Sequence, residues 1–309
     1  MISGCERSDA NRSVVLYTSI DQPIAAPIVR EFEKRTGIRV TLVTDTEATK
    51  SVGLAEKLRA EKSNPQADVW WSNEPFHTIN LAEEGLFVVC GAPEQHDVPT
   101  QFIAKNEQWA VNGFRVRVLA TAGDRVHRLD DLLDPRYRDK VAIARPSAGT
   151  TGGHVAALYA AWGDQRADEF FRKLRGNGVN LLGGNGPVAE AVGAGRMQIG
   201  LTDNDDVQAA RDNGGKIDPV LPDQQSLGTL IVPTTIAMVA DRKSDRDAAE
   251  KLIAYLASRE VEQKLIDAKF AYGSIRSPSV KAMDVDYVAV AKKMPEAVRR
   301  ATAILDGRQ

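Results

Sequence analysis

The sequence predicts an α/β protein made of two lobes, and three observations lead to this fold class. Short apolar runs alternate with helix-length amphipathic segments, as in open parallel sheets that are covered by helices. The chain has 309 residues, which is enough for about two domains of ordinary size. Two long extended segments, 108–122 and 230–240, interrupt the alternation and are expected to connect the two lobes.

The first alternating unit comes before the first extended segment. Its apolar runs predict buried strands, and Gly37 is placed to end the first helix. The expected order is strand 14–17, helix 24–36, strand 38–43, a helix through Leu54 and Leu58, strand 68–71 and helix 79–84.

The second unit lies between the extended segments, and the chain ends in helices. The expected order is strand 141–144, helices 152–162 and 167–174, strand 179–182, helix 188–194, strand 197–201, helix 207–211 and, after the second extended segment, helices 248–267 and 295–305. The predicted boundaries are a tether at 1–13, lobe 1 at 14–112 plus 241–309, and lobe 2 at 113–240.

Composition excludes several classes of protein. Forty Lys and Arg oppose 42 Asp and Glu, whereas a nucleic-acid-binding protein usually has a basic excess. No apolar run approaches the roughly 20 residues of a membrane span. The four histidines are scattered and no Gly-x-Ser-x-Gly motif occurs, so we do not expect an enzyme.

The two cysteines lie in different contexts. The segment Ile2-Ser3-Gly4-Cys5 resembles the lipobox of bacterial lipoproteins, in which the cysteine follows a cleaved signal peptide and carries the lipid. Cys5 is therefore the expected lipidation site and membrane anchor; the alternative is a free cysteine in a tail. Cys90 follows an apolar run and is expected to be a buried thiol.

Polar clusters follow successive predicted strands, at the edge where open α/β sheets bind ligands. These clusters are 18–21, 72–75, 145–154, 183–187 and 202–206. Each one alone is compatible with helix capping or turn formation. The helix start at 145–154 also suits an anion, and the three carboxylates within 202–206 repel one another unless a cation or a helix dipole compensates them. Together they predict a polar site between the lobes.

Three segments carry a family resemblance: 14–19, 32–40 and 67–70. They resemble periplasmic ferric-ion-binding proteins, which belong to the extracellular solute-binding proteins of ABC importers, and the likeness extends over nearly the whole chain. The resemblance implies a type II periplasmic-binding-protein fold, in which two α/β lobes are joined by two β-strand hinges and the ligand cleft lies between them.

The resemblance also implies site residues. Asp21 takes the place of the family's iron-binding histidine, Glu74 lies near its glutamate, and Asp205 and Asp206 replace its pair of tyrosines. These four carboxylates would suit a hard cation such as Fe(III), Ca(II), Mg(II) or Mn(II). The expected anion- or ligand-binding residues are Ser19, Ser147, Gly149, Thr150, Thr151, Asn185, Asn204 and Arg115.

The resulting hypothesis is a substrate-binding lipoprotein of an ABC importer, located in the periplasm or at the cell surface. Its ligand would be iron or another hard cation together with an anion such as carbonate or phosphate, and no cofactor is expected. The alternative ligand is an organic anion or zwitterion such as an aminophosphonate. The expected partner is the permease in the cytoplasmic membrane, and the protein is expected to be a monomer.

Overall fold

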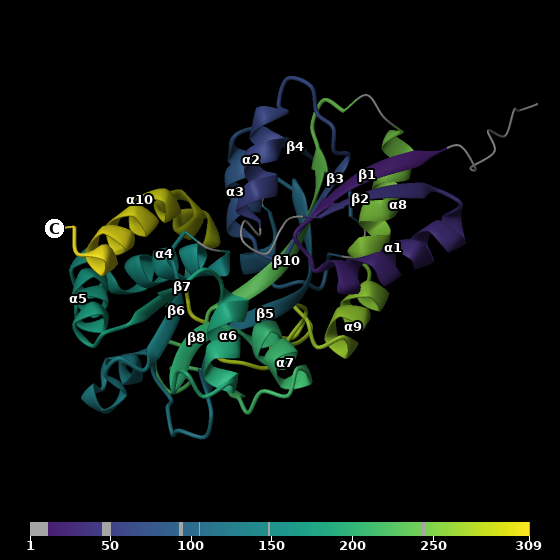
Figure 1. Ribbon diagram of the computed structural model, residues 1–309. Helices are drawn as coiled ribbons and strands as arrows, with labels where there is room; N and C mark the ends of the chain where they lie inside the picture. The colour runs from purple at the N-terminus through teal and green to yellow at the C-terminus, as the bar shows by residue number, and fades with distance from the viewer. Residues whose placement is uncertain are drawn as a thin grey trace, which may run out of the picture.

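The computed structural model describes residues 12–44, 51–92, 95–104, 106–147, 149–242 and 245–308 (Figure 1). The predicted lipidation site Cys5 lies outside these residues. The α-helices are α1 (Gln22–Thr36), α2 (Val52–Ala60), α3 (Phe76–Glu83), α4 (Thr150–Trp162), α5 (Asp164–Gly176), α6 (Asn185–Gly193), α7 (Asn204–Asp212), α8 (Arg246–Leu256), α9 (Arg259–Asp267) and α10 (Tyr287–Asp306). The short 3-10 helices among the described residues are η2 (Thr100–Phe102), η3 (Leu129–Leu133) and η4 (Pro135–Tyr137).

The strands form a continuous sheet in the order β2-β1-β3-β10-β5-β8-β6-β7, with β4 beside β10 and β9 beside β5. Their bounds are β1 (Ser13–Thr18), β2 (Arg39–Thr44), β3 (Val69–Ser72), β4 (Phe87–Val88), β5 (Trp109–Thr121), β6 (Val141–Ala144), β7 (Asn180–Leu182), β8 (Ile199–Asp203), β9 (Asp218–Val220) and β10 (Ile231–Val239). Strands β1, β2 and β3 are parallel, and so are β6, β7 and β8. These two parallel groups, with their helices, are lobes 1 and 2.

The two extended segments become β5 and β10, which pair antiparallel and connect the lobes, as predicted. The far edge of β10 pairs with β3 of lobe 1, and the end of β5 pairs with β8 of lobe 2. Gly113 is an extra residue in β5, because Asn112 pairs with Thr234 and Phe114 pairs with Pro233. Its φ of 56° favours glycine, and its N–H donates to Glu262 Oε1 at 2.8 Å.

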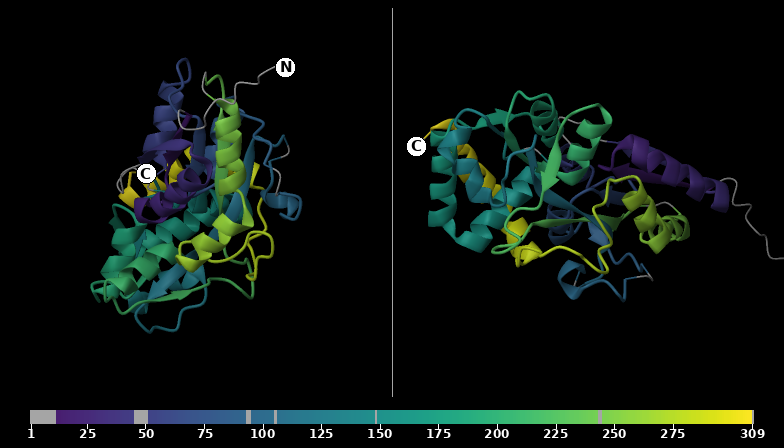
Figure 2. Two further views of the ribbon diagram at one scale, coloured as in Figure 1. Left: turned by 90° about the vertical axis from the view of Figure 1, so that its right-hand side faces the viewer. Right: turned by 90° about the horizontal axis from the view of Figure 1, so that it is seen from below.

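Helix α10 packs against α4 and α5 of lobe 2 and also against α3 of lobe 1 (Figures 1 and 2). The side chain of Phe76, at the start of α3, stacks on Tyr287 of α10 with 5.9 Å between ring centroids. The same Phe76 ring lies directly over Gly153 of α4, where an added Cβ would overlap it. The predicted boundaries assign 241–309, and with it α10, to lobe 1. Because α10 contacts both lobes, these boundaries stay a prediction.

Two predicted helices needed correction. The single helix at 248–267 is wrong: Ser258 separates α8 from α9 and caps α9, its Oγ accepting the N–H of Val261 at 3.3 Å. The last helix begins at Tyr287 rather than near Pro295, because Asp286 caps its first turn. Within the described residues, none of the helices combines the length and apolar character that a membrane span requires.

Candidate functional site

Two arginines of β5 lie at the centre of the molecule with almost no exposure, Arg115 at 2% and Arg117 at 0%. Charged side chains are rarely buried to this extent unless they are paired. Both meet Asp203, the last residue of β8: Arg117 Nη1 is 2.8 Å from its Oδ1 and Arg115 Nη1 is 3.1 Å from its Oδ2. The two guanidinium groups therefore share one carboxylate, and we call these three residues the arginine centre.

Arg115 connects the two lobes. Its Nη2 donates to the backbone oxygen of Asn73 in lobe 1 at 2.8 Å, and its Nη1 donates to Asp205 in lobe 2 at 3.0 Å. The guanidinium also lies 5.3 Å from the ring centroid of Phe270. Burial alone would lower the pKa of Arg115, but Asp205 and Asp203 outweigh burial and raise that pKa, so this side chain stays charged.

Arg117 holds the starts of two helices of lobe 2. Its Nη1 donates to Thr150 Oγ1 of α4 at 3.2 Å and to Asn185 Oδ1 of α6 at 3.1 Å. Its Nε donates to Nδ1 of His154 at 3.3 Å. Burial, together with the charge of Arg117, lowers the pKa of His154 to about 3, so this imidazole is neutral at physiological pH.

Three helices of lobe 2 begin beside the arginine centre. Helices α4 and α6 start at glycine N-caps, Gly149 and Gly184, which have no side chain for capping. Helix α7 starts at Asp203, whose carboxylate accepts from the arginines and from Thr150 instead of capping its own helix. Asn185 Nδ2 donates to Thr150 Oγ1 at 3.0 Å and to Asp203 at 3.3 Å, so the three starts are in contact. Helix N-termini carry positive partial charge and favour anions.

An acidic group lies next to these helix starts. Among the described residues, Asp203, Asp205 and Asp206 bring carboxylate oxygens within 4.8 Å of one another. Asp205 and Asp206 are half-buried, and Thr202 Oγ1 donates to Asp206 at 3.3 Å. Such a group can hold a metal ion or an ammonium group.

The other two predicted metal ligands are not part of this acidic group. Asp21 is the half-buried N-cap of α1, at the carboxyl end of β1. Glu74 is buried after β3, and its carboxylate accepts the N–H groups of Phe76 at 2.7 Å and His77 at 3.1 Å. Those bonds close the first turn of α3, which is a structural use of the Glu74 side chain.

The predicted ligand residues are distributed around the arginine centre in different roles. Thr150, Thr151 and Asn185 contact Arg117, and Gly149 begins α4 with a φ of 47°. Asn204 joins α7 to the sheet, because its Oδ1 accepts the N–H of Val116 at 2.8 Å.

Two predicted ligand residues lie elsewhere. Ser147 is exposed, in the loop before α4. Ser19 is buried in lobe 1 and donates to Asn73 Oδ1 at 3.0 Å, an oxygen that also accepts from Ser51 at 2.6 Å.

Sequence reasoning did not single out Arg117, and it included Asn73, His154 and Asp203 only as members of the strand-end clusters 72–75, 145–154 and 202–206. A signal for Arg117 was available: Arg115 and Arg117 alternate within an otherwise apolar strand, so they share a face, and two buried charges on one face require a carboxylate partner. No comparable local pattern identifies His154, which becomes a partner only when α4 packs against β5.

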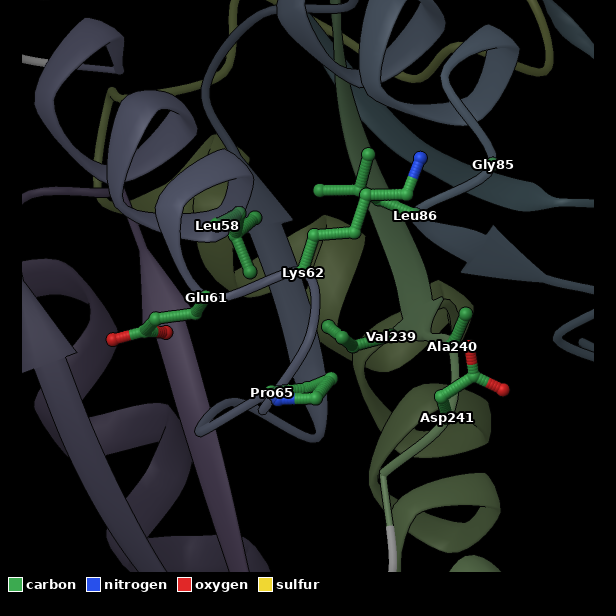
Figure 3. A pocket seen from close by; sticks show the side chains of 9 residues that line it. All are labelled: Leu58, Glu61, Lys62, Pro65, Gly85, Leu86, Val239, Ala240 and Asp241. Carbon is green, nitrogen blue, oxygen red and sulfur yellow. The ribbon is translucent and has the colours of Figure 1, made fainter.

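A small cavity of about 10 Å³ lies at the opposite end of the lobe 1 sheet (Figure 3). Its lining includes Pro65, which precedes β3, whereas Asn73 of the polar network follows β3. A volume of this size holds at most one water molecule, so this cavity is not a site for a solute.

Comparison with known proteins places the chain among binding proteins. It is 24% identical over 229 residues to an uncharacterised protein of Haemophilus influenzae, covering 70% of this chain and 65% of that protein. It is 25% identical over 287 residues to a putative 2-aminoethylphosphonate-binding periplasmic protein of Salmonella typhimurium, covering 90% of this chain and 78% of the relative.

A similar solved structure is the ferric binding protein of Campylobacter jejuni, with a TM-score of 0.81 at 21% identity over 95% of this chain and 98% of that one. This likeness supports the two-lobed fold. The model of the bacterial extracellular solute-binding proteins matches residues 13–270. The chain therefore belongs to the family of bacterial extracellular solute-binding proteins.

Proposed function

We propose that this solute-binding protein captures a small zwitterion, a molecule with a phosphonate, phosphate or carboxylate group at one end and an amine at the other. The observation that carries the proposal is the meeting of three helix starts and two buried guanidinium groups with the acidic group of Asp203, Asp205 and Asp206. A site with both kinds of charge matches a ligand that has both.

The anionic end is assigned to the starts of α4 and α6. Their N-cap glycines let a ligand approach the backbone N–H groups closely, and the half-buried Asn185 amide lies between the two helices. Arg117 lies beneath and is engaged with Thr150, Asn185 and Asp203. It supports this end by holding the helix starts in place and by its positive charge.

The amine end is assigned to Asp205 and Asp206. Two guanidinium groups face three carboxylates here, so one negative charge remains before the helix dipoles are counted. Asp205 and Asp206 are the two carboxylates of the group that keep partial exposure. The relative named for 2-aminoethylphosphonate binding makes this compound a suitable first ligand to test.

A hard cation bound together with carbonate or phosphate is the second candidate, and the clustering of three carboxylates within 4.8 Å favours it. The position of Arg115 works against it. Its guanidinium lies 3.1 Å from Asp203 and 3.0 Å from Asp205, so a cation between those carboxylates would face a fixed positive charge. The predicted carboxylate set of Asp21, Glu74, Asp205 and Asp206 belongs to this candidate.

In the cell, the loaded protein would deliver its solute to the permease of an ABC importer. We place it in the periplasm as a monomer, held at the membrane by a lipid on Cys5. Membership of the family of extracellular solute-binding proteins supports this transport role, and we propose binding and delivery of the solute rather than its chemical conversion.

A thermal-shift panel on chelator-stripped protein tests the proposed ligand. It compares 2-aminoethylphosphonate with ethylphosphonate, ethanolamine and Fe(III) citrate, the last with and without carbonate or phosphate. A ligand at about 100 times its Kd raises the free energy of unfolding by roughly 2.7 kcal/mol, and this raises the melting temperature by a few degrees. We expect the largest shift with the aminophosphonate and a smaller one with ethylphosphonate.

Two matched variants locate the binding. Asn185→Ala should reduce the aminophosphonate shift, whereas Asn213→Ala, at the exposed far end of α7, should leave it unchanged. A shift with Fe(III) and none with the zwitterion would replace the proposal with the hard-cation candidate.

A further inference from the structure

A second cavity, of about 550 Å³, lies between α3, η2, the beginning of β5 and the segment that enters α10. The elements are labelled in Figure 1, except η2. We call it the back cavity; its chemically distinctive lining residues are Glu83, Phe102, Trp109, Asp284, Asp286 and Tyr287. None of these residues belongs to the arginine centre or to the proposed zwitterion site. The volume is within the range of about 300 to 1,000 Å³ that small-molecule sites occupy.

The aromatic wall of the back cavity is held in place by a hydrogen bond and by ring contacts. Tyr287 donates from its hydroxyl to the backbone oxygen of Ile231 at 2.7 Å. Its ring stacks on Phe76 and meets Phe102 edge-on, with centroids 5.7 Å apart in the latter pair. Trp109 adds a half-buried indole. A ligand would thus meet a wall that is formed before binding.

The charged groups of the back cavity are acidic. Asp284 and Asp286 are exposed at the entry of α10, and the carboxylate of Asp286 is oriented by the N–H groups of Val288 and Ala289 at 2.8 and 3.2 Å. Glu83 pairs with Lys292, outside the lining, at 3.2 Å. Among the described residues that line the back cavity, none is a lysine, arginine or histidine.

We propose that the back cavity binds an organic ammonium compound, with its apolar body against Phe102, Trp109 and Tyr287 and its cation toward Asp284 and Asp286. Aromatic faces attract cations, and the two carboxylates add a favourable field at the opening. An anion of the same shape would be repelled by the same carboxylates. The cavity thus selects a class of ligand by charge as well as by shape.

The test uses three probes of nearly equal shape: 2-phenylethylamine, 2-phenylethanol and phenylacetate. Binding to the full chain is measured by calorimetry and by saturation-transfer NMR, at pH 7. We expect the amine to bind roughly tenfold more tightly than the alcohol, and the phenylacetate anion to bind least.

Matched variants assign the binding to this cavity. The double variant Asp284→Asn with Asp286→Asn should weaken binding of the amine by about fivefold and leave binding of the alcohol unchanged. Asparagine also caps helices, so α10 keeps its start. Glu169→Gln, an exposed charge on α5, should change neither affinity.

Three results would overturn the proposal. They are equal affinities for amine and alcohol, an amine affinity that the double Asn variant does not change, and no binding of the amine at about 10 mM, where fragment-sized ligands normally bind.

Discussion

Arg117 Nη1 lies 2.8 Å from Asp203 Oδ1, and neither side chain has more than 2% exposure. Burial by itself would raise the pKa of Asp203, but Arg117 and Arg115 lower it, so the carboxylate stays ionised. Arg117 and Asp203 lie directly opposite each other in the antiparallel pairing of β5 with β8, at the point where α7 begins. One carboxylate therefore links both arginines of β5 to the end of β8.

Asp203→Asn should lower the free energy of unfolding by about 3 to 5 kcal/mol, because it leaves buried guanidinium charge without its partner. Urea unfolding measures the loss. The control is Glu169→Gln, which removes an exposed 2.7 Å pair with Lys173 and should leave the free energy of unfolding nearly unchanged, because solvent screens exposed ion pairs. Equal effects of the two variants would show that the arginine centre is not a stabilising element.

His154 should make stability depend on pH. Its folded pKa of about 3 is below the ordinary value of about 6.5, so below about pH 6.5 the unfolded chain binds a proton that the folded chain rejects. The contribution of neutral His154 is fully present above about pH 6.5 and is lost as the pH falls toward 3, by at most about 1.4 kcal/mol per pH unit.

The measurement is denaturant unfolding of the wild type and of His154→Gln, which keeps an acceptor for Arg117, between about pH 7 and pH 4. The variant should show a flatter dependence, whereas His127→Gln, at an exposed position, should retain the wild-type slope. A variant slope equal to that of the wild type would mean that His154 does not resist protonation.

Gly153→Ala should destabilise the protein by about 1 to 3 kcal/mol, although alanine normally favours helices. The reason is the Phe76 ring of α3, which occupies the space of the added Cβ. Gly176→Ala in α5 is the matched control, since nothing lies within 4 Å of its Cβ position, and it should be neutral or stabilising. Thermal unfolding compares the two; a stabilising Gly153→Ala would contradict the close contact of α3 with α4.

Much of the fold could be predicted from local pattern. The strand at 141–144 matches β6, and Gly37 ends α1 in the left-handed conformation with a φ of 72°. Trp70 and Trp71 face opposite sides of β3, as alternation requires: Trp70 donates to Thr78, and Trp71 packs in a different core with Phe32. Ser258, which lies between α8 and α9 and caps the second, was not recognised as a helix boundary because the apolar pattern continues across it.

The candidate site was predictable only in part. The clusters at strand ends pointed to Thr150, Asn185 and Asp205, because strand ends on one side of a sheet meet in space. The partner of each residue was not predictable, since Arg117 and Asp203 pair across 86 positions of the chain. Glu74 shows the same limit: whether a carboxylate meets a ligand or the N–H groups of the next helix depends on backbone geometry, which the sequence does not contain.

A site that holds an anion and an amine at the same time should bind a ligand with both groups more tightly than one with the anion alone, and calorimetry measures that difference. The experiment measures 2-aminoethylphosphonate and ethylphosphonate binding to the wild type and to Asp206→Asn. We predict that the wild type prefers the aminophosphonate by about tenfold or more, and that Asp206→Asn removes the preference while ethylphosphonate binding is kept. Equal affinities for the two compounds in the wild type would show that the site does not bind the amine, and an unchanged preference in the variant would show that Asp206 does not bind it.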